Sequence, residues 1–221
     1  MSIRIGKIAI IGIVSGILQA QPISFGVKGG IPFTSAVEGS FGVHSEERRY
    51  TIGPVVEIGL PFSFAAEFDV LFKRTGYGTV DGAFGITSIS RVRANSWEFP
   101  LLAKCYLGGH GLPVRPFVNA GYVARRASGV EGLIHDFGRD AIGGNLVDRT
   151  FTLSPSVLIR DNPTHGVTAG GGLQFRALRL RVSAEIRYTR WMGHTFDQEG
   201  SRGFFVRSHQ NQTEFLVGLR F

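Results

Sequence analysis

The sequence has a single cysteine, Cys105, in 221 residues. One cysteine cannot close an intramolecular disulfide, so a fold held together by disulfides is excluded. Charged residues make up only 19% of the chain and hydrophobic residues 43%, a balance that excludes intrinsic disorder. The densest basic spots are two adjacent pairs, Arg48–Arg49 and Arg125–Arg126, which we interpret as solvated positions at strand–loop borders. We therefore expect no nucleic-acid partner.

Long apolar runs are lacking after the first twenty residues. The run Ile8–Leu18 covers about eleven residues, too few for a membrane-spanning helix, which needs about 20. Arg4 and Lys7 give this run a basic start, and Ala20 follows it. The order predicts a secretory signal peptide at residues 1–20 that is cut after Ala20. The alternative interpretation is a buried first helix.

Glycine (31 residues) and phenylalanine (18 residues) are abundant. Together with short segments that alternate with a period of two, they are typical of an all-β barrel or sandwich. The predicted mature domain, residues 21–221, contains eight such segments: 23–31, 50–60, 63–75, 93–107, 114–124, 166–176, 180–191 and 211–221. Short turns follow the second, fourth and sixth segments, and long polar loops follow the odd ones. This spacing predicts an antiparallel up-and-down barrel with its long loops at one end and both termini at the other.

The longest gap, residues 125–164, contains the apolar stretch RTFTLSPSVLIR. This stretch is too apolar for a disordered loop tip, so we expect a hairpin that extends the barrel or a surface that binds a partner. The alternative is an additional strand pair, which would give ten strands. The gap at 76–92 is rich in glycine and polar residues and is expected to be a loop.

Each predicted strand has one face without charge and one face with both acids and bases. In the third segment, Phe64, Phe68 and Phe72 alternate with Glu67 and Asp69. A soluble lipocalin-type carrier would place the apolar face inside, whereas an outer-membrane barrel places it against lipid. The mixed signs favour the second arrangement, because such residues can pair across a narrow, filled interior. The predicted interior ion-pair network consists of Glu57, Glu67, Asp69, Glu98, Lys104, Arg115, Glu185, Arg187, Glu214 and Arg220.

Aromatic residues gather near both ends of the apolar faces. Those near the long-loop end are Tyr50, Phe72, Trp97, Tyr122 and Tyr188, with Trp191 as a possible extension, and those near the turn end are Phe25, Phe64, Phe175 and Phe221. Two aromatic belts are typical of proteins that cross two membrane interfaces. Strands of about nine to eleven residues also match the length that a tilted strand needs to cross a bilayer.

The last segment alternates through the final residue, with Phe215, Val217, Leu219 and Phe221 on one face. Together with the signal peptide and the eight-strand plan, this C-terminal pattern resembles the small OmpA/OmpX-like outer-membrane β-barrel families of bacteria. The resemblance covers about residues 22–221 and departs from full-length OmpA proteins in having no peptidoglycan-binding domain. It implies an outer-membrane location, recognition of these four residues by the barrel-assembly machinery, and contact with outer-membrane lipids and lipopolysaccharide. We expect a monomer.

We find no set of residues that indicates catalysis, and we expect no cofactor and no metal. The adjacent residues His44, Ser45 and Glu46 point in alternating directions on an extended chain and cannot converge as a triad requires. Pairs from different loops, Ser183 or Ser208 with His165 or His194, stay open. The expected function is therefore structural or surface-binding and not enzymatic. The alternatives are a lipid- or lipopolysaccharide-modifying hydrolase, a narrow channel and a soluble lipocalin-like carrier.

Overall fold

The computed structural model describes residues 23–40, 42–45, 48–83, 85–108, 112–154, 159–177, 180–199 and 205–221. The predicted signal peptide, residues 1–20, lies outside the described residues. In the described part of the chain, no helix is both long and apolar enough to span a membrane.

Nine strands form the barrel wall. Two of them, β5 (Phe64–Asp69) and β6 (Leu71–Ala83), follow one another along the same position in the ring, so the wall has eight positions, which we call staves. They are β1 (Ile23–Pro32), β4 (Arg48–Gly59), β5 (Phe64–Asp69) continued by β6 (Leu71–Ala83), β7 (Ile86–Tyr106), β8 (Val114–Arg139), β10 (Thr164–Ala177), β11 (Leu180–Trp191) and β14 (Asn211–Arg220). The shorter elements are β2 (Val37–Gly39), β3 (Val43–Ser45), β9 (Leu146–Leu153), β12 (Asp197–Glu199), β13 (Phe205–Ser208) and one 3-10 turn, η2 (Pro61–Ser63).

The staves close into a ring. Each pairs antiparallel with its neighbours along the chain, and β14 closes the barrel by pairing with β1 from Gly26↔Arg220 to Pro32↔Glu214. The backbone N–H of Phe221 donates to the carbonyl of Phe25 at 2.9 Å, so pairing reaches the last residue. The prediction of an eight-stranded antiparallel up-and-down barrel is confirmed.

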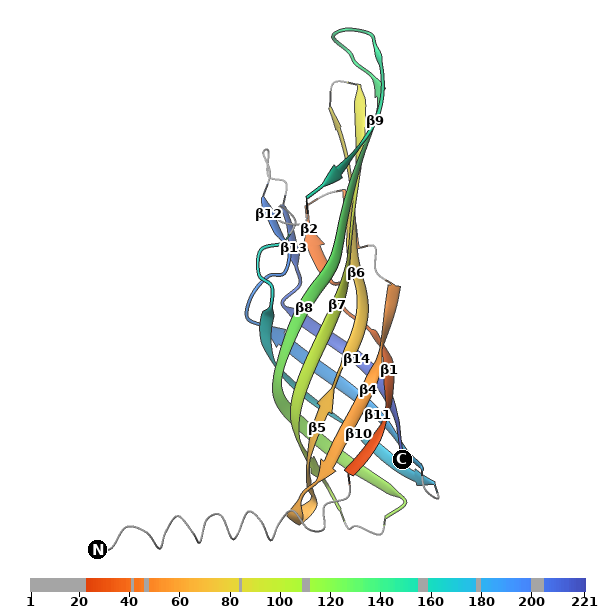
Figure 1. Ribbon diagram of the computed structural model, residues 1–221, viewed down its shortest axis with the longest axis vertical. Helices are drawn as coiled ribbons and strands as arrows, with labels where there is room; N and C mark the ends of the chain where they lie inside the picture. Colours follow the sequence, from red (N-terminus) through yellow and green to blue (C-terminus); the bar gives the residue numbers. More distant parts are fainter. Residues whose placement is uncertain are drawn as a thin grey trace, which may run out of the picture.

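The tight turns lie at one end of the barrel, together with the C-terminus, and the long connections rise from the other (Figure 1). The connection after β8 is the longest: β8 continues to Arg139 and folds back as β9. Within the described residues, β9 pairs with β8 alone, so it extends the wall upward without entering the ring. The hairpin prediction is confirmed, and the ten-strand alternative is wrong.

The region 76–92, expected to be a loop, is a hairpin instead. β6 and β7 stay paired up to Ala83↔Ile86, and β8 covers the other edge of β7 up to Ile86↔Gly138. We call the protruding sheet formed by residues 76–82, 86–93, 131–139 and 146–153 the ribbon. Glycine and polar residues weaken the intrinsic strand preference of 76–92. The hydrogen bonds from neighbouring strands, which lie far away in sequence, override that weakness.

A second small sheet packs against the base of the ribbon on the side that faces the barrel axis. It has the strand order β12-β13-β2, and we call it the cap. Seven buried residues form its core with the ribbon: Val37, Tyr77, Val92, Ala94, Val130, Phe196 and Val206. Burial raises the pKa of the Tyr77 hydroxyl to about 12. The cap assembles from the first and last long connections, which were expected to be loops.

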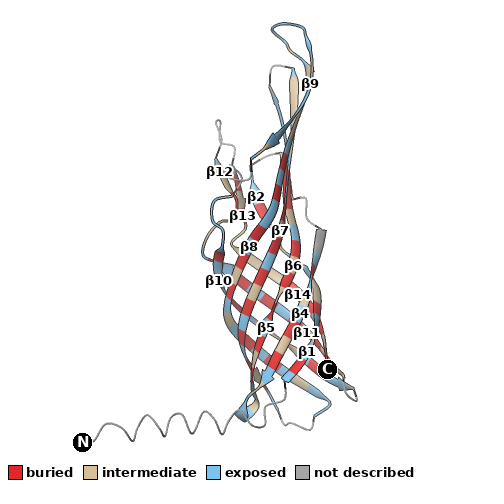
Figure 2. Ribbon diagram, viewed as in Figure 1, coloured by how far each residue is buried: buried red, intermediate tan, exposed pale blue. Residues whose placement is uncertain are grey.

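Burial alternates along every stave, as Figure 2 shows by its alternating colours. Leu101, Ile186 and Val27 are more than half exposed, whereas Lys28, Glu67 and other charged residues are buried. The apolar faces therefore point outward and the charged faces inward, as predicted. The soluble-carrier alternative, which needs an apolar interior, does not fit this arrangement.

Glycines make room for the long inward side chains. A Cβ atom on Gly26 would lie 1.9 Å from the carbonyl oxygen of Leu219, and one on Gly30 would lie 2.0 Å from that of Phe215. These glycines flank Lys28 on the inward face of β1, where the backbones of β1 and β14 approach closely. Any larger residue there would push the closing strand pair apart.

Candidate functional site

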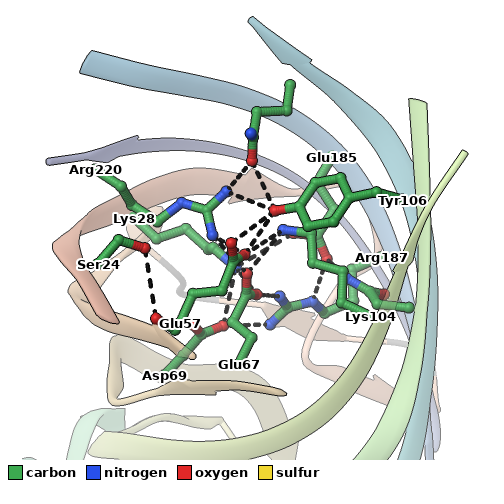
Figure 3. Close-up of polar contacts among 12 residues, drawn as sticks. Ser24, Lys28, Glu57, Glu67, Asp69, Lys104, Tyr106, Glu185, Arg187 and Arg220 are labelled. Carbon is green, nitrogen blue, oxygen red and sulfur yellow. Dashed lines mark hydrogen bonds and ion pairs between the residues drawn. The ribbon is translucent and has the colours of Figure 1, made fainter. Parts of the chain in front are cut away.

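The barrel interior contains a buried charge network centred on Glu67, whose side chain is 0% exposed (Figure 3). Lys28 Nζ contacts the Glu67 carboxylate, and it also lies 3.1 Å from Asp69 Oδ2 and 3.3 Å from Glu185 Oε2. Lys104 Nζ lies 2.9 Å from the second oxygen of Glu67. Both carboxylate oxygens of Glu67 therefore face a cation.

Two arginines complete this network from opposite sides. Arg187 donates to Glu185 at 2.7 Å and to Asp69 at 2.9 Å, and its Nη2 lies 3.4 Å from Glu67. Arg220 contacts Glu57, and its Nη1 lies 3.4 Å from Glu67. Each arginine joins two or more carboxylates, so the network ties together strands that lie apart in the ring.

Neutral groups surround the network toward the turn end. The Tyr106 hydroxyl donates to the Glu57 carboxylate at 2.8 Å and lies 2.7 Å from Gln174 Oε1. The Arg115 guanidinium lies over the Tyr106 ring, 4.4 Å from its centre. Its Nε and Nη2 atoms have no hydrogen-bond partner among the described residues. Arg115, predicted to be a member of the ion-pair network, therefore makes a cation–π contact instead.

A second charge cluster lies nearer the long-loop end. Lys73 Nζ bridges Glu98 at 2.7 Å and Glu214 at 2.5 Å. Arg125 donates to Glu98 at 2.8 Å, so the interpretation of Arg125 as a solvated border residue is wrong. Its guanidinium lies 3.7 Å from the centre of the Trp191 ring.

Trp191 does not extend the outer belt as expected. Its side chain is 1% exposed, and its Nε1 donates to Gln212 Oε1 at 3.2 Å. The alternation along β11 explains this position, because Glu185, Arg187 and Trp191 share the inward face.

The charges of the two clusters balance each other. Six acids face six bases in the two clusters: Glu57, Glu67, Asp69, Glu98, Glu185 and Glu214 with Lys28, Lys73, Lys104, Arg125, Arg187 and Arg220. Sequence alternation identified most of this set. Lys28, Lys73 and Arg125 belong to it as well. The alternation of β1, β6 and β8 puts them on the inward faces of these strands, and this was the signal that could have placed them in the network.

A small pocket, with a cavity volume of about 20 Å³, opens where β1 ends, at the long-loop mouth of the barrel. Its lining residues are Pro32, Thr34, Ser35, Ala36, Tyr50, Lys73, Arg74, Thr75, Arg125, His209, Asn211 and Gln212. Lys73 and Arg125 in this lining are neutralised by Glu98 and Glu214. The second charge cluster therefore contributes two side chains to the lining of this pocket.

The cap is tied by its own ion pairs. Arg160 contacts Asp197, and Arg207 Nε donates to the same carboxylate at 2.9 Å. Desolvation by burial acts to raise the pKa of Asp197, but the hydrogen bonds from the two arginines outweigh it, so that the pKa lies below its usual range.

The predicted aromatic belts lie on the outward face. Near the long-loop end, the ring of Phe72 lies 6.4 Å from that of Tyr50 and 5.0 Å from that of Trp97. Tyr122 stacks on His165 with ring centres 5.8 Å apart. At the turn end, Phe25, Phe64 and Phe175 are exposed.

The four residues of the C-terminal pattern also lie outward. Phe215 and Leu219 are half-buried between neighbouring strands, Val217 is exposed, and Phe221 is 69% exposed. The inward residues next to them in the sequence include Glu214 and Arg220, which are members of the charge clusters.

The structure does not bring the candidate serine–histidine pairs together. Ser183 is buried on the inward face of β11, whereas His165 is exposed on the outward face of β10. The His194 ring contacts the backbone carbonyl of Ser208 at 2.9 Å and not its hydroxyl. Glu46 of the third candidate set lies outside the described residues. The described part of the chain contains no group of three or more His, Cys, Asp or Glu residues that could hold a metal ion.

No family model matches the chain, and no curated protein matches it. Among solved structures, it is similar to Neisserial surface protein A, with 13% identity, a TM-score of 0.40, and coverage of 91% of this chain and 98% of that one. It is also similar to the N-terminal β-barrel domain of Pseudomonas aeruginosa OprF, with 14% identity, a TM-score of 0.35, and coverage of 90% and 97%. The outer membrane protease OmpT of Escherichia coli has 10% identity, a TM-score of 0.39, and coverage of 90% and 93%.

By its own geometry, the chain belongs to the class of eight-stranded antiparallel barrels with a charged interior and an apolar exterior.

Proposed function

We propose that the protein is an integral outer-membrane β-barrel with a structural or surface-binding role, and that it acts without catalysis or cofactor. One observation carries this proposal: the faces of the barrel are inverted relative to a soluble protein. Leu101, Ile186 and Val27 are exposed on the wall, while Glu67 and Lys28 are buried inside. In water such a surface would aggregate, whereas in lipid it is the favourable arrangement.

Closure of the ring supports a membrane location independently. Lipid offers no hydrogen bonds to backbone groups, so a spanning sheet must have no open edge. The pairing of β14 with β1 satisfies the backbone up to Phe221. The aromatic residues at both ends of the wall, such as Trp97 and Phe175, suit the two lipid–water interfaces.

The interior is expected to be closed to solutes. Lys28, Glu67, Lys104 and Arg187 form continuous contacts across the barrel, and each is less than about a tenth exposed. To open a path, several buried ion pairs would have to separate without compensation, which is costly in a low-dielectric environment. The network therefore acts as a plug, in contrast to the narrow-channel alternative.

We infer the route of export and membrane assembly from the predicted signal peptide and the C-terminal pattern. The predicted signal peptide would direct export across the inner membrane. The outward residues Phe215, Val217, Leu219 and Phe221 would present the recognition pattern to the barrel-assembly machinery. The pairing of β14 with β1 within one chain supports a monomer. The ribbon, which rises beyond the wall, offers the surface for an external partner.

The test combines fractionation with gel mobility. Outer-membrane fractions from expressing cells should contain the protein, and unboiled samples should migrate differently from boiled ones, because a closed barrel resists detergent until it is heated. In planar bilayers the same protein should give no stepwise conductance. Recovery from the soluble periplasmic pool without a mobility shift would contradict membrane integration, and regular conductance steps would contradict the plug.

A further inference from the structure

Four arginines lie on the inward face of the barrel at its turn end. They are Arg115 on β8, Arg176 on β10, Arg181 on β11 and Arg220 on β14, and we call them the turn-end arginines. The alternation of each strand puts them on the inward face, because the residues two positions away along the same strands are buried: Phe117, Gln174, Ser183 and Gly218.

The strand registers put three of these arginines in one row. Arg176 lies directly opposite Arg181 across the β10–β11 pair, and Arg181 lies directly opposite Arg220 across the β11–β14 pair. Because adjacent strands are about 4.8 Å apart, the row is about 10 Å long between its outer Cα atoms. Like charges that lie directly opposite one another in a sheet are destabilising. An anion between these side chains would remove that repulsion.

Arg115 joins this row through Tyr106. Its guanidinium lies over the Tyr106 ring, 4.4 Å from the ring centre. Nη2 of Arg220 lies 3.3 Å from the hydroxyl of the same tyrosine, as Figure 3 shows. The charges of Arg115 and Arg181 both act on this hydroxyl. Three of the turn-end arginines therefore lie around one side chain.

Arg220 is the one member of the four that has an acid partner among the described residues. It contacts Glu57, which already belongs to the balanced charge network. The other three side chains take part in no hydrogen bond and no ion pair within the described part of the chain. Nε and Nη2 of Arg115 and Nε of Arg220 are buried donors without an acceptor there. A buried donor without an acceptor is costly, so these groups lack a partner that the chain does not supply.

The sequence has no acid that could compensate these charges at the turn end. From the last residues of each strand through the turn to the first residues of the next strand, it contains no Asp or Glu, in the segments 59–66, 105–117, 173–184 and 216–221. The carboxylate of Phe221 ends the chain here, but among the described residues no ion pair joins it to an arginine. An anion from outside the chain is therefore the partner that these arginines lack.

The chemistry of the turn-end arginines selects a phosphate anion of high charge. A guanidinium fork donates two parallel hydrogen bonds to phosphate oxygens, and a phosphate group has enough oxygens for several such forks. A polyvalent anion also compensates more than one arginine. Arg176 is exposed, and Arg115 and Arg181 are half-buried, so a solute at the mouth can reach them. Their inward orientation favours a soluble anion over a lipid headgroup, because lipids contact the outward face of the wall.

We propose that the turn-end arginines bind a soluble polyvalent phosphate anion, such as a diphosphate, which reaches the barrel mouth from the periplasm. The assignment to the periplasmic side rests on the proposed function. Arg176 and Arg181 hold the anion at the mouth, and Arg115 supplies donors from the neighbouring strand. Arg220 lies behind them and joins the site to the charge network, which closes the interior, so the anion is bound and not conducted.

The experiment uses the full mature protein in phosphatidylcholine nanodiscs at low ionic strength and measures the binding of inorganic pyrophosphate by isothermal titration calorimetry. The site variant is Arg176→Gln with Arg181→Gln. The matched control, Arg126→Gln with Arg139→Gln, removes the same charge from two exposed arginines, one near the long-loop end of the wall and one on the ribbon. The site variant should lose about tenfold or more in affinity, because charge-assisted hydrogen bonds are lost, and the control should bind like the parent protein.

Further outcomes separate the possible sources of the anion. Equal affinity of the parent protein and the site variant would overturn the inference, as would an equal loss in the control. Native mass spectrometry from nanodiscs that also contain phosphatidylglycerol tests the lipid source. If the parent protein retains this lipid and the site variant loses it, the arginines bind a headgroup and not a soluble anion. Tighter binding of a polyglutamate peptide than of pyrophosphate would overturn the inference in favour of an acidic protein partner.

Gel mobility of the unboiled protein reports insertion separately. The site variant should keep the heat-dependent shift, because its substitutions remove like charges that face each other. Inserted parent protein that binds no pyrophosphate would contradict the anion site alone, whereas absence of insertion would contradict the proposed function.

Discussion

Glu67 shows what a buried charge in this interior requires. Its carboxylate is fully buried and contacts four cations: Lys28, Lys104, Arg187 and Arg220. Removal of a charge from water is expensive, and only close opposite charges with good hydrogen bonds offset the cost. The same contacts make the cations depend on Glu67, because each of them is also nearly without access to water.

Glu67→Gln should therefore destabilise the barrel strongly while it preserves side-chain volume. We expect a loss of about 3 to 5 kcal/mol in the free energy of unfolding, since the substitution leaves buried cations without compensation. Urea titration of protein refolded into lipid vesicles measures it. The control Asp148→Asn, at a carboxylate 78% exposed on the ribbon, should change stability by less than about 1 kcal/mol. Equal stability of both variants would mean that Glu67 is solvated.

The alternation of the sequence predicts which residues of a strand share a face, but it does not predict which residues contact each other. Alternation placed Glu67, Glu98 and Arg187 on one face of their strands, because a strand has only two faces, and the mixed signs of the charges on that face indicated that it points inward. It could not choose partners, since these depend on register and rotamer across strands distant in sequence. Arg115 illustrates the limit. The alternation puts it on the same inward face as the network, but its guanidinium lies over the Tyr106 ring.

Among the elements, β7 defines the lipid face most clearly. Its outward residues Leu101 and Ala103 are exposed on the stretch between Trp97 and the turn end of the strand, and its inward neighbours Leu102 and Lys104 are 1% exposed. Ala103 lies in a row of alanines, opposite Ala66 on one side and Ala120 on the other. Among the described residues nothing covers this row, so in a membrane lipid would cover it.

Ala103→Arg should cost about 2 to 4 kcal/mol in folding free energy, because an arginine near the bilayer midplane must be drawn out of hydrocarbon or be solvated within it. Equilibrium unfolding in vesicles is the measurement. Ala141→Arg, in the exposed turn of the β8–β9 hairpin, serves as the comparison and should be nearly neutral. A cost near zero at Ala103 would show that this face is not in lipid.

The ribbon should be separable from the barrel. Gly132 and Leu153 are directly paired, so deletion of residues 133–152 and insertion of an Asn-Gly turn between them keeps the register below. We expect the shortened protein to insert and to keep its heat-dependent gel mobility, because the interior clusters and ring closure are unaffected. The shortened protein retains Leu153, which packs against the core of the cap. Failure to insert would therefore mean that the upper hairpin is needed for assembly.

Element boundaries were predictable in the wall and not above it. The wall strands alternate between two sharply different environments, so segments such as 180–191 stand out in the sequence. Above the wall both faces of β6 and β7 are more polar and contain glycine, which removes the signal even though pairing continues to Ala83 and Ile86. The cap strands are three or four residues long, too short for any periodicity.

At the scale of the whole molecule, three environments are stacked along one axis. The wall presents an apolar outer surface, its interior holds compensated charges, and the ribbon with the cap extends beyond the mouth (Figures 1 and 2). The small core around Tyr77 and Phe196 stabilises the cap separately from the barrel. Stability is thus assigned to the buried charges and ring closure, and the ribbon is the part to which we assign the proposed surface-binding role.

The most direct test of the inverted faces is the depth of a single outward residue in lipid. In a Cys105→Ser background, Leu101→Cys, at a position 57% exposed, is labelled with a small fluorophore and reconstituted with lipids carrying a mid-chain spin label. Thr150→Cys on the ribbon is the control. We predict strong quenching at residue 101 and little at residue 150. Weak quenching at residue 101, with ready access to a water-soluble quencher, would contradict the account.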